Sequence, residues 1–332
     1  MITTKNTNDT NPGARYSTRG FAIAALSGDG RAAASCVGGS PILVGGGGPW
    51  FAPMAWLRRG ALGLLVGLLA STADASSAGR TNSFFAFDNG VGREAKWSPE
   101  QQAATLARFG YAGIGYSGVN DLAARQAAFR AKGLKIFNLY VAVYVDRPVA
   151  YDPELTAALP QLAGTGTVLW LTVQGRSPND DRAVALVREL ADAASKHGVK
   201  IALYPHKGFF IATAEDALRV LPRIDRSNVG LTINLCHELA AGHADRMDAI
   251  VQACAKHLML VSINGADRTG GWPELIRPLG EGNFDVARFL TSLDRIGYTG
   301  PIGLQCYNLK TPPEEHLAKS IATWKSYVRS GR

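Results

Sequence analysis

The stretch 135–173, KIFNLYVAVYVDRPVAYDPELTAALPQLAGTGTVLWLTV, contains one complete unit of the pattern that decides the fold. The apolar run 135–143 predicts a buried strand, and 153–162 has the 3.6-residue period of a helix. A second apolar run, 167–173, follows a Gly-rich turn. A strand, a helix and another strand in this order predict two parallel strands, because the crossover returns the chain to the same edge of the sheet.

The same order of elements recurs along the chain from residue 84 onward. The predicted strands are 84–87, 112–116, 135–143, 167–173, 200–204, 229–234, 259–263 and 301–306. A helical period follows each of them, and the last helix covers 314–328. Eight such units in about 250 residues are typical of a closed (β/α)8 TIM barrel, so we predict a single α/β barrel domain over 76–332. An open doubly wound sheet is the competing architecture, but the turn after the first strand, DNGVG at 88–92, lacks the GxGxxG pattern of a nucleotide-binding loop.

The composition is that of an ordinary globular protein. Of the 332 residues, 46% are hydrophobic and 19% are charged, which excludes collagen-like, coiled-coil and wholly disordered chains. The formal net charge is +8, but basic and acidic residues alternate along the predicted helices and form no basic run. A solvated surface accounts for this pattern better than a phosphate-binding face, so we expect no nucleic-acid partner. The four cysteines include no CxxC pair that would indicate structural zinc.

The first 75 residues do not follow the barrel pattern. Residues 1–53 have no sustained apolar period, which predicts disorder, and we interpret them as the product of an upstream mis-start. From Met54, a short basic region, the apolar stretch 60–70 and an Ala-x-Ala end at Ala75 predict a secretory signal peptide over 54–75. The apolar stretch is too short to span a membrane. The sequence thus predicts a periplasmic or secreted protein without membrane association after signal cleavage.

Polar residues gather at the predicted strand ends in the second half of the chain. In a TIM barrel the catalytic residues lie at the carboxyl ends of the strands. His206 and His237 follow the fifth and sixth strands, and two histidines that face one cavity favour ligand binding or acid–base catalysis. Lys207 could stabilise a developing negative charge. We therefore predict His206, Lys207 and His237 as catalytic residues.

Three segments carry a resemblance to a known family. They are VGLTINLCHELAAG at 229–242, LGEGNFD at 279–285 and GYTGPIGL at 297–304. In this order they resemble the strand-six segment, a following loop and the lead into strand eight of the xylose isomerase-like TIM barrels, the sugar phosphate isomerase/epimerase superfamily. The resemblance extends over 84–328. It implies the barrel fold and chemistry on a small carbohydrate.

The resemblance also implies a metal site whose ligands this chain lacks. Typical members hold one divalent metal with Glu, Asp, His and Glu after strands five to eight. The matching positions here are Tyr204, Asn234, Ser262 and Gln305. Four neutral groups do not supply the negative charge that a hard cation needs, so we expect no cofactor and no family-type metal.

Neutral amides and hydroxyls suit a carbohydrate, which is recognised by hydrogen bonds and by flat apolar faces. The predicted substrate-binding residues are Tyr204, Asn234, Ser262, Asn264, Asp267 and Gln305. Further candidates near the rim are Tyr116, Asn138, Trp170, Arg268 and Trp272.

Three functions remain open at this point. The first is a secreted isomerase- or epimerase-like enzyme that abstracts a proton next to the carbonyl of a sugar or keto-sugar, with β-elimination from keto-glycosides as a variant. His206 would act as base or acid in this reaction. The second is a non-catalytic saccharide-binding barrel. The third is a metalloenzyme with a rearranged ligand set of His206, His237 and Asp267. A homo-oligomer is compatible with all three.

Overall fold

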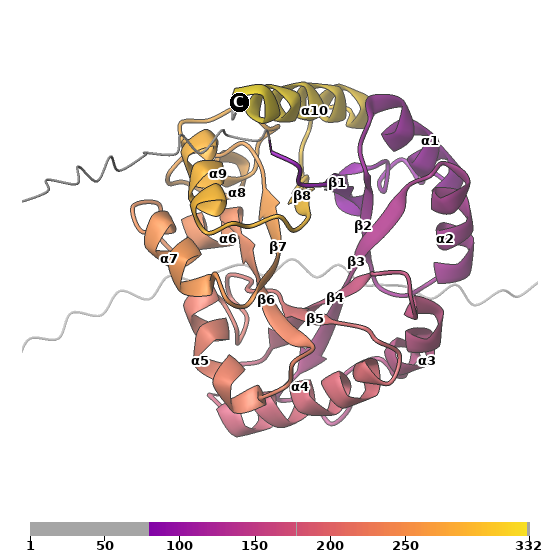
Figure 1. The fold of residues 1–332 in the computed structure, drawn as a ribbon, viewed down its shortest axis with the longest axis vertical. Helices are drawn as coiled ribbons and strands as arrows, with labels where there is room; N and C mark the ends of the chain where they lie inside the picture. Colours follow the sequence, from indigo (N-terminus) through magenta and orange to yellow (C-terminus); the bar gives the residue numbers. More distant parts are fainter. Residues whose placement is uncertain (1–79, 177, 331–332) are drawn as a thin grey trace, which may run out of the picture. The chain divides into compact units, whose positions relative to one another are not determined.

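A computed structural model describes residues 80–176 and 178–330 (Figure 1). The predicted upstream segment 1–53 and the predicted signal peptide 54–75 lie outside the described residues. Eight parallel strands form a closed barrel in sequence order, and β8 pairs with β1 to complete it. The strands are β1 (Phe84–Phe87), β2 (Gly113–Ser117), β3 (Lys135–Tyr144), β4 (Val168–Gln174), β5 (Ile201–Leu203), β6 (Val229–Asn234), β7 (Leu258–Ile263) and β8 (Ile302–Leu304). The predicted (β/α)8 barrel is confirmed.

The longer helices encircle the strands (Figure 1). They are α1 (Pro99–Phe109), α2 (Leu122–Ala131), α3 (Pro153–Leu162), α4 (Asp180–Ser195), α5 (Ala214–Ile224), α7 (Met247–Cys254), α9 (Val286–Arg295) and α10 (Pro313–Ser330). Three short helical segments were not predicted: the 3-10 helix η1 (Asp88–Gly90), α6 (Leu235–Ala240) and α8 (Trp272–Leu275). All three lie in connections that follow a strand, where the site of a TIM barrel is built.

Local sequence signals account for where the helices begin. Ser98 and Gln101 form a capping box at the start of α1, where Pro99 occupies the first turn. Thr213 and Asp216 form the same motif at the start of α5. Each box satisfies main-chain N–H groups that a helix start leaves without partners, and so fixes the end of the preceding loop.

The barrel interior is filled by aromatic side chains. Alternate residues of β1 point to opposite faces, so Phe84 packs among the helices while Phe85 enters the barrel. Phe85 is fully buried and stacks on Phe137 at 4.7 Å between ring centroids. Its ring fits because β8 has Gly303 opposite, where a Cβ atom would lie 2.6 Å from the Cζ of Phe85. These rings close the barrel below the strand ends.

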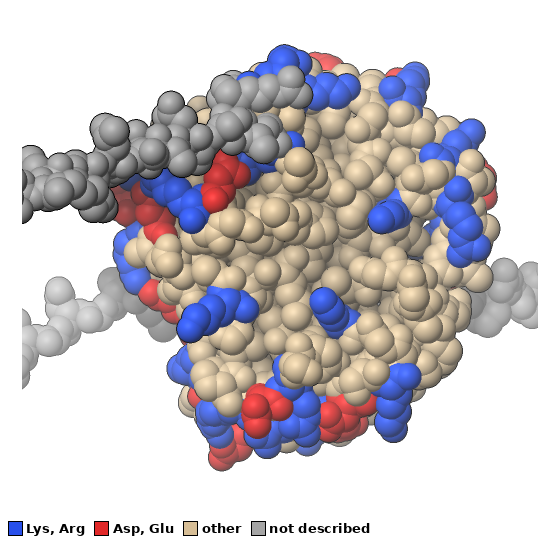
Figure 2. Space-filling model, viewed as in Figure 1, with Lys and Arg blue, Asp and Glu red and all other residues tan. Residues whose placement is uncertain are grey.

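The described surface has no single-sign patch on the face shown in Figure 2. Lys and Arg lie beside Asp and Glu around its edge, and most of its middle is uncharged. Among the described helices, none is both long and apolar enough to cross a membrane.

Candidate active site

A cavity of about 340 Å³ opens at the carboxyl ends of the strands. Four residues predicted for the site line it, together with Trp272. They are Tyr204, His206, His237 and Gln305. The residues that follow β5, β6 and β8 thus meet in this cavity, as expected for a TIM barrel, whose site lies at the carboxyl ends of the strands.

The two histidines lie against each other in this cavity. The ring centroids of His206 and His237 are 4.0 Å apart, and the rings are inclined by 40°. Phe209 stacks on the outer face of His206 at 4.0 Å, and Trp272 meets His237 edge to face at 5.4 Å. Burial lowers the pKa of both imidazoles, and the neighbouring His206 lowers that of His237 further. Both rings are therefore neutral near pH 7.

The main chain of Lys207 fixes opposite tautomers in the two imidazole rings. The Nδ1 of His206 lies 3.0 Å from the carbonyl oxygen of Lys207, so this nitrogen must carry the proton and donate. The N–H of Lys207 donates to the Nδ1 of His237 at 3.4 Å, so this nitrogen carries a lone pair. A neutral imidazole has one donor and one acceptor. The Nε2 of His206 is consequently an acceptor, and the Nε2 of His237 is a donor.

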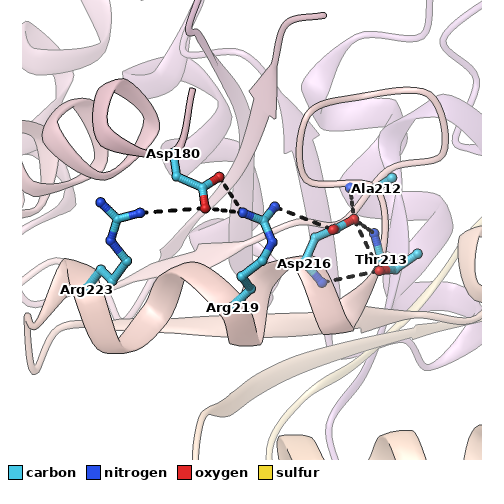
Figure 3. A network of polar contacts seen from close by, with 6 residues as sticks. All are labelled: Asp180, Ala212, Thr213, Asp216, Arg219 and Arg223. Atoms are coloured by element: carbon cyan, nitrogen blue, oxygen red, sulfur yellow. Dashed lines mark hydrogen bonds and ion pairs between the residues drawn. The ribbon is translucent and has the colours of Figure 1, made fainter. Parts of the chain in front are cut away.

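The loop that carries His206 is anchored at both ends. The N–H of His206 donates to the carbonyl of Ile211 at 3.0 Å, which closes the loop on itself. At its far end, the carboxylate of Asp216 accepts from the N–H groups of Ala212 and Thr213 at 3.0 and 3.1 Å. Arg219 then bridges Asp216 and Asp180, so that α5 is tied to α4 (Figure 3). This network holds the loop beside the cavity.

The four positions of the family metal ligands hold neutral side chains that are hydrogen-bonded in two pairs, and this set of four is called the neutral ring below. Ser262 donates to the Oδ1 of Asn234 at 3.0 Å, and the Nδ2 of Asn234 donates to the carbonyl of Pro205 at 2.7 Å. Gln305 donates to the phenol oxygen of Tyr204 at 3.4 Å. Tyr204 and Gln305 reach the cavity, whereas Asn234 and Ser262 are fully buried and do not line it.

The donor atoms of this ring do not fit a divalent metal. Burial holds the pKa of Tyr204 well above its usual value, so the phenol stays neutral. The Oε1 of Gln305 already accepts from the N–H groups of Cys306 and Tyr307 at 2.9 and 3.0 Å. In the stretches 80–176 and 178–330, no three His, Cys, Asp or Glu side chains are grouped so that they could hold a metal ion. The rearranged set of His206, His237 and Asp267 is therefore not assembled.

Three other predicted site residues lie outside the cavity lining. The side chain of Lys207 is exposed, and its contact with the site is made by its main chain. Asn264 is buried and donates to the carbonyls of Gly265 and Leu275, both at 2.7 Å. Asp267 pairs with Arg277 at 2.7 Å. The last two residues hold the connection after β7, which carries Trp272 into the cavity.

The further candidates have different surroundings. Trp170 lies inside the barrel at 5.0 Å from the ring of Tyr204, and Asn138 is fully buried. Tyr116 packs edge to face against Phe129 on the helix side. Arg268 pairs with Asp245 at the surface.

Sequence reasoning missed the side of the cavity built by β1 to β3 and two lining residues that follow β7 and β8. The lining residues that it did not assign to the site are Phe87, Asn89, Arg93, Ser117, Tyr140, Ile276 and Tyr307. Asn89 and Ser117 follow the strand-end rule and could have been found by applying it to the first two strands. Arg93 and Ile276 lie several residues beyond their strands, and no local pattern marks them.

Comparisons with known proteins agree with this architecture. The inosose isomerase of Bacillus subtilis is 27% identical over 136 residues, which cover 38% of this chain and 46% of that protein. Among solved structures, the D-allulose 3-epimerase of Methylomonas sp. is 21% identical with a TM-score of 0.60, covering 75% of this chain and 98% of that one. The 3-keto-D-glucoside 4-epimerase of E. coli is 16% identical with a TM-score of 0.60, over 75% and 99%. These two likenesses concern the fold.

The family model described as xylose isomerase-like TIM barrel matches residues 154–327, which is more than half of the chain. The alignments with the curated relatives span less than half of each relative's length. The matched segment begins in α3 and ends in α10, and it includes both cavity histidines. This chain belongs to the xylose isomerase-like TIM barrel family.

Proposed function

We propose that the protein moves a proton at a carbon next to a carbonyl group of a sugar or keto-sugar, as in epimerisation or keto–aldose isomerisation. The observation that carries this proposal is the histidine pair, in which Lys207 leaves an acceptor on His206 and a donor on His237. Relatives named as an inosose isomerase and a ketose 3-epimerase support carbohydrate chemistry of this type.

His206 is the base in this reaction. Its Nε2 takes the proton from the carbon, and the electron pair moves onto the carbonyl oxygen to form an enolate. His237 donates from its Nε2 to that oxygen. Return of a proton to the opposite face of the same carbon gives the epimer. Return to the adjacent carbon, with transfer of the hydroxyl proton to the enolate oxygen, gives the isomer. His206 releases the proton that it took, so neither reaction needs an oxidant or reductant. Because both imidazoles are neutral, His206 can accept a proton without first losing one to water.

A site whose family ligand positions are all neutral favours an activated substrate. Without a divalent cation, the enolate is stabilised by hydrogen bonds alone, and a metal Lewis acid supplies several kcal/mol more. A keto-sugar, whose carbonyl acidifies the neighbouring C–H bond, needs less assistance than an ordinary aldose. The aromatic walls of the cavity, including Trp272 and Tyr140, suit the flat apolar face of a sugar ring.

The test is exchange of carbon-bound hydrogen in deuterated water, followed by NMR across a panel of keto-sugars. We expect exchange that falls about 100- to 10,000-fold in His206→Gln, the range for a lost general base. His257→Gln, at an exposed histidine outside the cavity, is the matched control. Saturable binding without exchange by the wild type would support the saccharide-binding alternative. A conjugated, ultraviolet-absorbing product would identify the β-eliminating lyase.

We also propose that the protein acts in the periplasm or outside the cell. The supporting observation is that 54–75 has the basic start, short apolar stretch and Ala-x-Ala end that are typical of a signal peptide. Mass spectrometry of the native protein should find a chain that begins at Ser76. Peptides from before Met54 would contradict both the signal peptide and the upstream mis-start.

A further inference from the structure

The described lining of the cavity contains one full charge, in the connection after β1 and away from the segments after β5 and β6 that carry the histidines. Among the described residues that line it, Arg93 alone is charged near neutral pH, because the two histidines are neutral. Arg93 lies just beyond η1, in the connection between β1 and α1. A cation among neutral polar and aromatic groups is a selective element for a negatively charged ligand.

The contact with Asp88 leaves most N–H donors of the Arg93 guanidinium without a partner in that carboxylate. Its Nη2 lies 3.6 Å from Asp88, and the Arg93 side chain is 53% exposed. The two carboxylate oxygens of Asp88 accept from the N–H and hydroxyl of Ser117, at 3.1 and 2.9 Å. Asp88 therefore orients Arg93 from one side, while donors of the planar guanidinium remain available.

Asn89 adds a neutral acceptor next to this cation. Its Nδ2 donates to the Oε1 of Gln305 at 2.8 Å, which fixes the amide, and its Oδ1 has no hydrogen-bond partner within the described residues. A buried acceptor without a partner is costly unless a ligand or water satisfies it. The Oδ1 is almost inaccessible to water in this structure, so a sugar hydroxyl would reach it only after the Asn89 side chain turns toward the cavity that this residue lines.

We propose that Arg93 and Asn89 form a subsite for a sugar acid, with Arg93 binding its carboxylate and Asn89 a neighbouring hydroxyl. This inference rests on the proposed function, because it places the anionic end of the substrate away from the histidines that act on the carbonyl. The substrate class is then a keto-sugar that carries a carboxylate.

A carboxylate fits this subsite better than a phosphate. One guanidinium matches a carboxylate through two parallel hydrogen bonds. A phosphate dianion would bring a second negative charge close to Asp88, 3.6 Å from the guanidinium, and the described lining has no second cation to offset it.

The first experiment compares three probes on the intact protein: glucose, glucuronate and glucose 6-phosphate. Binding is followed by the fluorescence of Trp272, with Trp272→Phe to identify the signal, and by the shift in melting temperature. We expect glucuronate to bind about 10- to 100-fold more tightly than glucose, the range for a hydrogen bond to a charged group. Tighter binding of glucose 6-phosphate than of glucuronate would overturn the carboxylate assignment.

The second experiment removes the charge. Arg93→Gln should abolish the preference for glucuronate over glucose by weakening glucuronate binding about 10- to 100-fold. Arg108→Gln is the matched control, because Arg108 is also half-exposed and paired with a carboxylate, that of Glu314 at 2.9 Å, but lies outside the cavity. A preference that persists in Arg93→Gln overturns the proposal.

Failure of this inference is distinguishable from failure of the proposed function. If neutral and acidic keto-sugars exchange hydrogen equally fast, and Arg93→Gln changes neither rate, the acid–base function stands and the subsite is wrong. If glucuronate binds through Arg93 but no sugar exchanges hydrogen, the subsite stands and the acid–base function is wrong.

Discussion

The carboxylate of Glu238 accepts a hydrogen bond from the main-chain N–H of Ala214 at 2.7 Å. Glu238 is the residue after His237, and Ala214 is the first residue of the helix that follows the His206 loop. The other carboxylate oxygen of Glu238 lies 2.8 Å from the Nδ1 of His243. A single buried side chain therefore joins the two segments that carry the cavity histidines.

Replacement of Glu238 tests whether its carboxylate holds the two segments together. We expect Glu238→Ala to lower the free energy of unfolding by about 1–3 kcal/mol, because it leaves a buried N–H group and His243 without partners. Glu238→Gln retains an acceptor for Ala214 and should lose much less. Urea unfolding measures both effects. If the Ala variant is as stable as the wild type, Glu238 does not hold these segments together.

Stability should fall in mild acid because several histidines are buried in the neutral form. Burial lowers the pKa of His316 to about 4, and it also lowers the pKa of His206 and His237. The unfolded chain then binds more protons than the folded one below pH 6.5, so stability decreases as the pH falls from about 6.5 toward 4. Glu238, whose pKa burial raises, changes stability in the opposite direction and offsets part of this loss.

The share of His316 can be isolated by urea unfolding at pH 7.5 and pH 5. From its pKa, His316 should account for about 2 kcal/mol of the loss at pH 5. His316→Gln should reduce the pH dependence by that amount. Equal pH dependence in His316→Gln and in the wild type would contradict the buried neutral state of His316.

The rate of hydrogen exchange on a keto-sugar should persist to mildly acidic pH. A base works in its deprotonated form, and burial lowers the pKa of His206, so the acid limb of the rate profile should lie below pH 6.5. Circular dichroism at each pH separates this effect from unfolding. An acid limb above pH 6.5 would exclude His206 as the base.

The sequence was informative wherever position along a strand determines position in the barrel. His206 and His237 meet in one cavity because β5 and β6 are parallel neighbours with fixed register, and both residues follow a strand end. The same rule located Tyr204 and Gln305. In a closed barrel this geometry depends on strand pairing, which periodicity reveals.

The sequence was least informative for residues placed by loop conformation. Asn264 and Asp267 also follow a strand, but the chain after β7 turns back, and Gly265 and Arg277 exchange main-chain hydrogen bonds at 3.0 and 2.7 Å. This turn holds Asp267 against Arg277, outside the cavity lining. Trp272, which comes later in the same connection, lines the cavity in place of Asn264 and Asp267. Arg93 enters the cavity through the turns after η1, a conformation that no periodicity encodes.

The neutral ring should be convertible into a metal site. Replacing all four positions by the family's ligands, with Tyr204→Glu, Asn234→Asp, Ser262→His and Gln305→Glu, supplies the charge that a hard cation needs. Without metal this variant should be less stable than the wild type, because it buries carboxylates that have no partner. Binding of Mn²⁺ to the folded state then stabilises it by about 2.7 kcal/mol at one hundred times the dissociation constant.

Thermal unfolding with Mn²⁺ and with EDTA measures the difference. For a domain of this size the variant should melt about 5–10 °C higher with Mn²⁺ than with EDTA. The wild type should melt at the same temperature in both, since its phenol is neutral and the oxygens of Asn234 and Gln305 already accept hydrogen bonds. The comparison on the wild type is informative even if the variant with four substitutions does not fold. A wild type that Mn²⁺ stabilises would show that the ring accepts a cation, and the metal-free role of the histidine pair would then be wrong.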